Sequence, residues 1–139
     1  MINIVAIDHV VLRVSDLAQM VRFYVDVLGA RLEKEQEDIG LYQLRVGTSL
    51  IDLVPVDSKL GQMGGAAPGS DGRNLDHVAF QVLPWNGEEI LRHLKSHGIE
   101  SEIKSRYGAE GDGPSIYLTD PEGNGLELKG PPWPPVSNS

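Results

Sequence analysis

The sequence predicts an α+β fold built from two tandem βαβββ modules, and two observations point to it. The segments Asp8–Val14 and Asp76–Val82 share the pattern Asp-His-Val-x-x-x-Val. Each is followed by the same order of expected elements, a helix and then three strands. The two histidines are 68 residues apart, and the glycines expected to end the two helices are 69 apart. An internal duplication explains this agreement better than chance does.

The first strand of each module alternates apolar side chains with less apolar ones, as a strand does when one of its faces lies in a core. In the first module the apolar face carries Val10, Leu12 and Val14, and His9 lies on the opposite face. In the second module Val78, Phe80 and Val82 form the apolar face, and His77 lies opposite. Both histidines are therefore expected on the face that points away from the helix.

A helix follows each of these strands. Ser15 or Asp16 is expected to cap the N-terminus of the first helix, and Gly29 is expected to end it. In the second helix Asn86 is the expected N-cap and Gly98 the expected end. The remaining expected strands are Ala30–Gln36, Leu41–Val46, Ser49–Val54, Ile99–Ile103, Ser115–Thr119 and Gly125–Lys129.

The chain is expected to form one domain in four parts. These are the first module at 1–56, a Gly-rich linker at 57–74, the second module at 75–130 and a Pro-rich tail at 131–139. A second Gly-rich loop is expected at Lys104–Pro114.

Composition excludes several classes of function. The chain has 139 residues with 12 Lys plus Arg against 20 Asp plus Glu, a net charge of −8, and this balance argues against nucleic acid and anionic membranes as partners. The absence of Cys excludes disulfides, thiolate metal ligands and a thiol nucleophile. Apolar runs are too short for a membrane span and no secretory signal is visible, so a cytoplasmic protein is expected.

Two carboxylates stand among apolar residues in the last strand of each module. Asp52 lies between Ile51 and Leu53, and Glu127 lies between Leu126 and Leu128. Alternation places both carboxylates on the face that holds the two strand histidines. Imidazole and carboxylate are ligands of divalent metals, so His9, Asp52, His77 and Glu127 are predicted metal ligands. His93 and His97 have helical metal-pair spacing but no accompanying carboxylate, so they are expected to be bystanders.

The paired Asp-His-Val strands, the stretch Phe23–Ala30, the turn Asp120–Asn124 and the ending Leu126-Glu127-Leu128 resemble the vicinal oxygen chelate superfamily. This group includes glyoxalase I, fosfomycin-resistance thiol transferases, bleomycin-binding proteins, methylmalonyl-CoA epimerase and extradiol dioxygenases. The resemblance covers residues 4–130. It implies a curved mixed sheet around a divalent metal, helices on the outer face, a small-molecule substrate and a homodimer.

By this resemblance His9, His77 and Glu127 match the commonest ligand triad of the family. Asp52 matches the position of a fourth ligand, usually Glu or Gln, but its side chain is shorter, so binding through water is an alternative. The metal would be Zn, Ni, Co, Mn or Fe. Its open positions would chelate two adjacent oxygens of a substrate, with Glu127 or Asp52 as the catalytic base.

The resemblance implies first a metal-dependent lyase or isomerase similar to glyoxalase. A ring-cleaving dioxygenase is the second alternative, followed by a fosfomycin-type thiol transferase, which Val11 disfavours because that group carries Thr there. A metal-free bleomycin-type binding protein is the fourth, disfavoured because the ligand residues are retained. Arg106 and Tyr107 of the second Gly-rich loop are candidate substrate contacts. Two alternatives stay open for this loop: a lid on which Arg106 binds a substrate carboxylate or phosphate, or a mobile surface loop on which Arg106 is solvated.

Overall fold

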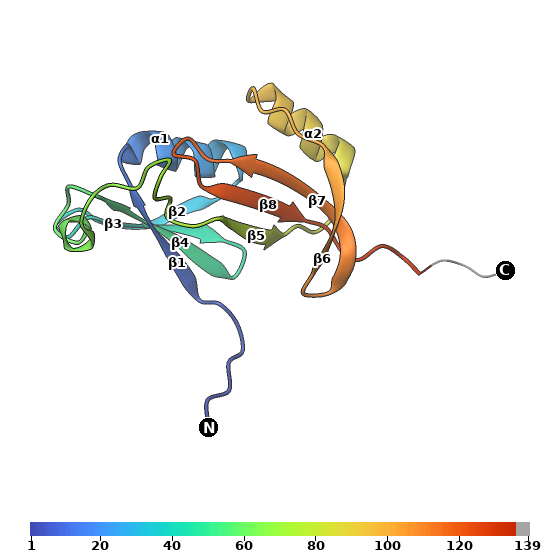
Figure 1. Cartoon of the computed structure of the whole chain (residues 1–139), viewed down its shortest axis with the longest axis horizontal. Coiled ribbons are helices and arrows are strands. Elements are labelled where there is room, and N and C mark those ends of the chain that lie inside the picture. The colour runs from blue at the N-terminus through green and yellow to red at the C-terminus, as the bar shows by residue number, and fades with distance from the viewer. Residues whose placement is uncertain (136–139) are drawn as a thin grey trace. The chain divides into compact units, whose positions relative to one another are not determined.

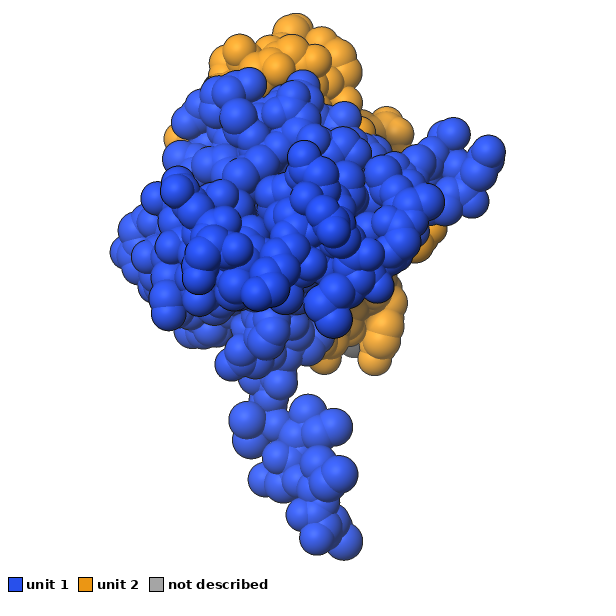
Figure 2. Space-filling view, turned by 90° about the vertical axis from the view of Figure 1, so that its left-hand side faces the viewer, with its two compact units in different colours: residues 1–74, 120–123 blue, residues 75–119, 124–139 orange. Residues whose placement is uncertain are grey.

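The computed structural model describes residues 1–135, and residues 136–139 of the predicted tail lie outside the described part. Contacts divide the chain into two compact units (Figure 2). Unit 1 comprises Met1–Asn74 together with the turn Asp120–Gly123, and unit 2 comprises Leu75–Thr119 and the residues from Asn124 onward. Each unit holds a four-stranded mixed sheet. The α+β class and the two βαβββ modules are thereby confirmed.

Unit 1 contains the strands β1 (His9–Val14), β2 (Arg31–Gln36), β3 (Leu41–Val46) and β4 (Ser49–Pro55) in the spatial order β1-β4-β3-β2. Strands β1 and β4 are parallel, and the other pairs are antiparallel. The helix α1 (Leu17–Arg22) continues into a π-helical turn, Phe23–Val27, and lies along the sheet (Figure 1).

Local sequence accounts for the ends of this helix. The Asp16 carboxylate accepts a hydrogen bond from the backbone N–H of Gln19, which satisfies a donor that the first turn cannot pair. At the other end Gly29 adopts a φ of +75°, a conformation that glycine reaches without steric strain. The π-helical turn between them was not predicted, because the apolar spacing reads as a continuous helix.

The predicted faces of β1 are confirmed by burial. Leu12 and Val14 are fully buried with Met20 and Tyr24 of the helical segment, and Ile51 of β4 joins them. The opposite face of β1, which carries His9, therefore does not contribute to this core.

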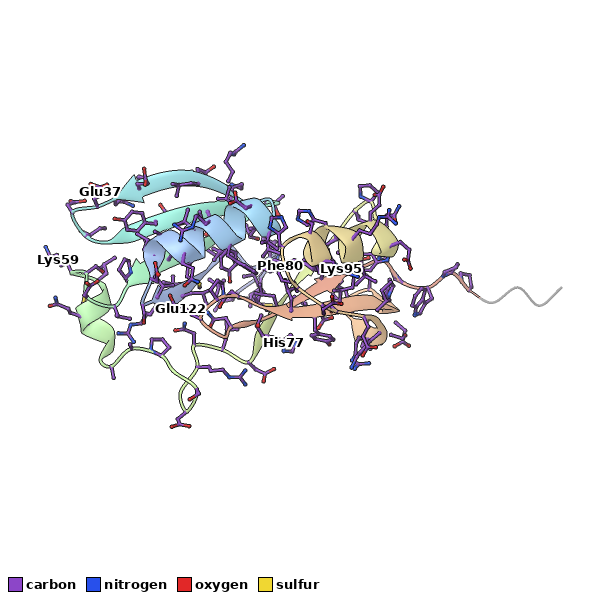
Figure 3. The ribbon with its side chains drawn as sticks, turned by 90° about the horizontal axis from the view of Figure 1, so that it is seen from above. Glu37, Lys59, His77, Phe80, Lys95 and Glu122 are labelled. Atoms are coloured by element: carbon purple, nitrogen blue, oxygen red, sulfur yellow. The ribbon has the colours of Figure 1, made fainter. Side chains whose placement is uncertain are left out.

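The turn Asp120–Gly123 packs against the helical segment of unit 1. Asp120 Oδ2 accepts a hydrogen bond of 2.9 Å from the Tyr24 hydroxyl, and both side chains are buried. The Glu122 carboxylate accepts hydrogen bonds from the backbone N–H groups of Ser15 and Asp16, at the start of α1 (Figure 3). A carboxylate at this end of a helix also meets the positive end of the helix dipole.

Tyr24→Phe is expected to lower the free energy of unfolding by about 1–2 kcal/mol at neutral pH, because Asp120 loses a buried donor. Burial, followed by the negative charge of Asp120, raises the pKa of Tyr24. The unfolded chain releases this proton near pH 10, so the wild-type protein loses stability as pH rises above about 10. Urea unfolding at neutral and alkaline pH should show a smaller alkaline loss in Tyr24→Phe. Tyr107→Phe serves as the control because Tyr107 is exposed. It should change neither the free energy of unfolding at neutral pH nor its loss at alkaline pH.

Unit 2 repeats the same order with β5 (His77–Gln81), α2 (Gly87–Ser96), β6 (Ile103–Gly108), β7 (Gly111–Thr119) and β8 (Gly125–Lys129). The spatial order is β5-β8-β7-β6, and β5 and β8 are parallel. The predicted cap is confirmed, since Asn86 Oδ1 accepts a hydrogen bond from the backbone N–H of Glu89. The core face holds Leu94, Ile116, Leu118, Leu126 and Leu128.

The structure corrects one region of unit 2. The strand predicted at Ile99–Ile103 instead begins at Ile103, and the loop predicted at Lys104–Pro114 is a β-hairpin formed by β6 and β7. Its glycines serve close packing, because a Cβ at Gly108 would meet the Lys129 side chain and one at Gly113 would meet the Pro131 carbonyl. The prediction of a loop here was wrong, because glycines that permit close packing resemble loop glycines in a sequence.

The proline-rich segment after β8 crosses this hairpin. The Trp133 backbone N–H donates to Asp112 O, and Trp133 Nε1–H donates to Ser105 Oγ at 2.8 Å. Within residues 1–135 the helices are too short and too polar to cross a bilayer.

Candidate metal site

The first pair of predicted ligands lies on the face of the unit 1 sheet opposite α1. His9 opens β1, and Asp52 lies on the adjacent strand β4, paired in register with Val11. Both side chains line one cleft of unit 1. The histidine and carboxylate are thus diagonal neighbours on a single face, as the alternation predicted.

A carboxylate fixes the orientation of the His9 ring. Nδ1 of His9 lies 2.7 Å from Asp8 Oδ2, so in the neutral ring this contact favours the proton on Nδ1 and the lone pair on Nε2. This hydrogen bond, followed by the negative charge of Asp52, raises the pKa of His9. Ligating histidines in metalloproteins commonly have such a carboxylate partner on the ring nitrogen that does not bind metal.

Asp52 is 3% exposed, yet its side-chain contacts are weak. Both of its oxygens lie 3.3–3.4 Å from Gln43 Nε2 on β3, which is a long distance for a hydrogen bond. Most of the acceptor capacity of this carboxylate is therefore open toward the cleft, for a metal ion, a water molecule or a proton.

The second pair lies in unit 2 with the same strand geometry. His77 opens β5, and Glu127 on the parallel strand β8 pairs in register with Ala79. The atoms His77 Nε2 and Glu127 Oε1 are 3.4 Å apart. Two ligands of a tetrahedral ion with bonds of about 2.0–2.1 Å lie roughly 3.3–3.4 Å from each other, so the separation of this pair matches that of two ligands of one ion.

Neighbouring polar groups hold this second pair in place. His77 Nδ1 lies 2.7 Å from Asp76 Oδ2, which repeats the arrangement of His9 with Asp8. Glu127 is 6% exposed, and its Oε2 accepts a 2.8 Å hydrogen bond from Ser115 Oγ. Glu127 Oε1, on the side of His77, is thus the oxygen directed at a ligand position.

Tyr117 forms one wall of the unit 2 pair. Its ring meets His77 edge to face with centroids 5.9 Å apart, and the Arg106 guanidinium lies 5.7 Å from the ring centroid. Burial raises the pKa of Tyr117, and its hydrogen bond to Glu127 adds to this shift. Arg106 thus lies beside the candidate ligands, on strand β6 and not in the predicted loop. Tyr107 follows it in β6, so its side chain points to the opposite face and is 80% exposed.

No three His, Cys, Asp or Glu side chains of residues 1–135 gather closely enough to hold a metal among them. Each unit instead supplies one pair. His93 of α2 and His97, which caps the end of this helix, meet edge to face with ring centroids 4.9 Å apart.

The residues that the sequence reasoning missed are the partners of the ligands. Asp8 and Asp76 belong to the repeated Asp-His-Val pattern, but the sequence reasoning gave them no role beside the ligands. It also did not predict the contacts of Gln43, Ser115 and Tyr117 with the candidate ligands. For the two aspartates the signal was present, because each directly precedes its histidine in both modules.

Asp76→Ala is expected to weaken metal binding about 10- to 100-fold, because the His77 ring loses the acceptor that fixes its tautomer and orientation. Titration of the metal-free protein with Zn²⁺ would measure the change. Asp71→Ala is the control, because Asp71 is exposed. Equal Zn²⁺ affinities of the two variants would contradict the proposal that Asp76 orients the His77 ring.

Lys129 is a further buried charge on β8. It is 8% exposed, and its Nζ finds no hydrogen-bond acceptor within residues 1–135. Burying an unpaired ammonium is unfavourable, so Lys129→Met is expected to raise the free energy of unfolding by about 1 kcal/mol. Chemical denaturation of both proteins tests this, and a less stable variant would contradict it.

Comparison with known proteins assigns the family. The family model described as the Glyoxalase/Bleomycin resistance protein/Dioxygenase superfamily matches residues 6–128. The chain belongs to this superfamily. The match includes all four predicted ligands and both βαβββ modules.

Members with diverse names are similar to the chain. Virulence protein STM3117 of Salmonella typhimurium is 29% identical over 130 residues, covering 88% of this chain and 81% of that protein. Its crystal structure aligns with a TM-score of 0.77 at 28% identity, covering 94% of this chain and 99% of the other.

Two further relatives carry enzyme names. Biphenyl-2,3-diol 1,2-dioxygenase 3 of Rhodococcus globerulus is 30% identical over 125 residues, covering 87% of this chain and 60% of that protein. The metallothiol transferase FosB of Staphylococcus epidermidis is 26% identical over 126 residues, covering 91% of this chain and 82% of the other. The superfamily thus spans several chemistries, and its membership alone does not select one.

Proposed function

We propose that this superfamily member is a divalent-metal enzyme that binds two adjacent oxygens of a small substrate and moves a proton, as a glyoxalase-like lyase or isomerase does. The 3.4 Å separation of His77 Nε2 and Glu127 Oε1 carries the metal part of the proposal. Asp52, buried in the His9 cleft with open acceptor capacity, carries the proton-transfer part.

The donor set fits a divalent transition metal. His9, His77 and Glu127 would hold it, joined by Asp52 directly or through water, and nitrogen and oxygen donors of this kind suit Zn, Ni, Co, Mn and Fe. When bound, the ion would act as a Lewis acid that stabilises negative charge on substrate oxygens.

The protein's own groups would then carry out three tasks. Asp8 and Asp76 hold Nδ1 of the two imidazole rings and leave each Nε2 for ligation. Ser115 holds Glu127 Oε2 and leaves Oε1 for ligation. Asp52, whose oxygens make longer contacts than Glu127 Oε2 does, would take a proton from the substrate carbon next to the chelated oxygens and return it. Arg106, beside Tyr117, is the proposed contact for an anionic substrate group on the unit 2 side, and Tyr107 remains a weaker candidate.

We further propose a homodimer in which the unit 1 pair of one copy and the unit 2 pair of the other share an ion. One observation in favour is that each pair supplies only two ligands. A second is the arm before β1, where Ile2, Ile4, Val5 and Ile7 are 78–89% exposed (Figure 1). Apolar side chains clustered in this way commonly mark protein interfaces.

A ring-cleaving dioxygenase is the second candidate. His9, His77 and Glu127 alone form a two-histidine, one-carboxylate set of the kind that non-haem iron oxygenases use, and the dioxygenase relative at 30% identity adds weight.

Elemental analysis of protein purified without added metal tests these proposals, combined with assays for isomerisation of 2-oxoaldehyde adducts and for oxygen consumption with catechols. Zn, Ni or Co with isomerisation supports the lyase or isomerase. Iron with oxygen consumption supports the dioxygenase. Fosfomycin-dependent thiol consumption would favour a thiol transferase. Failure to bind any metal after reconstitution would overturn the proposal in favour of a metal-free binding protein.

A further inference from the structure

The cleft of unit 1 extends well beyond the two candidate ligands in it. Its volume is about 480 Å³, within the range of small-molecule sites. Besides His9 and Asp52, its walls are mainly apolar, formed by Val11, Leu41, Val54, Leu60 and Met63. A cleft of this size holds more than the two oxygens of a chelating group.

Two of the apolar wall residues remain open to solvent. Val11 is 46% exposed and Met63 is 83% exposed, although both line the cleft. An apolar ligand group placed between them would remove this surface from water, and that removal is favourable in proportion to the area covered.

The arginine of the cleft is not available to bind a charged ligand. Arg13 is the basic residue of its described wall, and its Nη1 and Nη2 groups already donate to the carbonyls of Gly61, Gly65 and Ala66. Gly64 covers the Arg13 Nε. Arg13 therefore anchors the segment 61–66, which carries Met63, and has little capacity left for a carboxylate or phosphate.

Lys59, which lies just before this segment, does not supply a positive charge to the cleft either. Lys59 is exposed and does not line the cleft, and its side chain points away from the body of unit 1 (Figure 3). The polar groups that a ligand meets in the cleft are thus chiefly His9 and Asp52.

We infer that the substrate is a vicinal-oxygen compound with an uncharged apolar substituent, aromatic or branched aliphatic, and that this substituent binds between Val11 and Met63. The inference rests on the proposed function, because the chelated oxygens place the substituent beside His9. It narrows the substrate class, since an anionic group, where present, binds elsewhere than in this cleft.

Isothermal titration of the Zn²⁺-loaded protein with three catechols tests the inference without turnover. The probes are catechol, 4-tert-butylcatechol and the anionic 3,4-dihydroxybenzoate. We expect 4-tert-butylcatechol to bind at least about tenfold more tightly than catechol, given the apolar area that its substituent covers. The carboxylate of 3,4-dihydroxybenzoate should give no gain.

Variants locate the effect. Val11→Ser and Met63→Ser should each reduce the preference for 4-tert-butylcatechol over catechol about threefold or more. Leu83→Ser is the matched control, because Leu83 is 76% exposed and lies in unit 2 outside the cleft.

The outcomes separate the inference from the proposed function. Catechol binding with no preference for the apolar probe, or with a preference for the anionic one, would overturn the inference alone. A preference that both cleft variants leave intact would also overturn it, as would loss of self-association in Met63→Ser, which would assign the cleft to a second copy. Failure of catechol to bind at all would overturn the proposed function, and the inference with it.

Discussion

His77→Ala is expected to lower the affinity of the protein for divalent metal by more than a hundredfold. Removing an outer partner of a ligand typically lowers affinity about 10- to 100-fold, and removal of the ligand itself should exceed this range. His77 Nε2 lies 3.4 Å from Glu127 Oε1, so its loss leaves Glu127 as the single donor of the unit 2 pair. Competition titration with a chromophoric chelator measures the affinity.

His93→Ala is the matched control for this variant. It removes an imidazole from α2, where the His93 ring meets that of His97 edge to face. Metal affinity within about twofold of wild type is expected for this control. Equal losses in His77→Ala and His93→Ala would show that the assay reports surface imidazoles and would refute the assignment of His77.

The same variant can locate the proposed shared site. A homodimer of His9→Ala lacks one ligand in both sites, and a homodimer of His77→Ala lacks another. If the site is shared across two copies, mixed dimers contain one site with both histidines, and random exchange restores about a quarter of the wild-type metal sites. Recovery of no metal on mixing, with exchange verified by mass spectrometry, would instead place both pairs of ligands within one chain.

Much of the fold could be predicted because the two modules of the duplication each show the same pattern of elements. The Asp-His-Val pattern, the helix caps and the alternation in β1, β4, β5 and β8 predicted consistent elements, and the strand registers place Asp52 beside Val11 and Glu127 beside Ala79, on the expected faces. Alternation also placed each histidine and its carboxylate on one face. Period-two patterns carry this information directly, since successive side chains point to opposite faces.

The hairpin of β6 and β7 could not be predicted in this way. Its glycines allow Lys129 and Pro131 to pack closely, but in the sequence they suggest a loop. The hydrogen bonds of Ser115 to Glu127 and of Gln43 to Asp52 were missed for another reason. They depend on the register between strands, which the alternation within one strand does not determine.

Asp52→Asn is expected to keep most of the bound metal and to lower turnover about 100- to 10,000-fold, the usual contribution of a general base. The amide has nearly the same shape as the carboxylate and keeps one oxygen, so the cleft and its contact with Gln43 should persist. Asn cannot accept the substrate proton. Metal content and kcat, measured on the same preparation, test both parts.

Asp57→Asn provides the comparison for this variant, since Asp57 is exposed in the segment after β4 and does not line the cleft. Its turnover should equal that of the wild type. If Asp52→Asn loses metal as fully as His77→Ala does, Asp52 is a ligand and its separate role as a base is refuted. If Asp52→Asn instead keeps both its metal and its turnover while consuming oxygen with catechols, the three residues His9, His77 and Glu127 suffice for the chemistry, which favours ring cleavage over proton transfer.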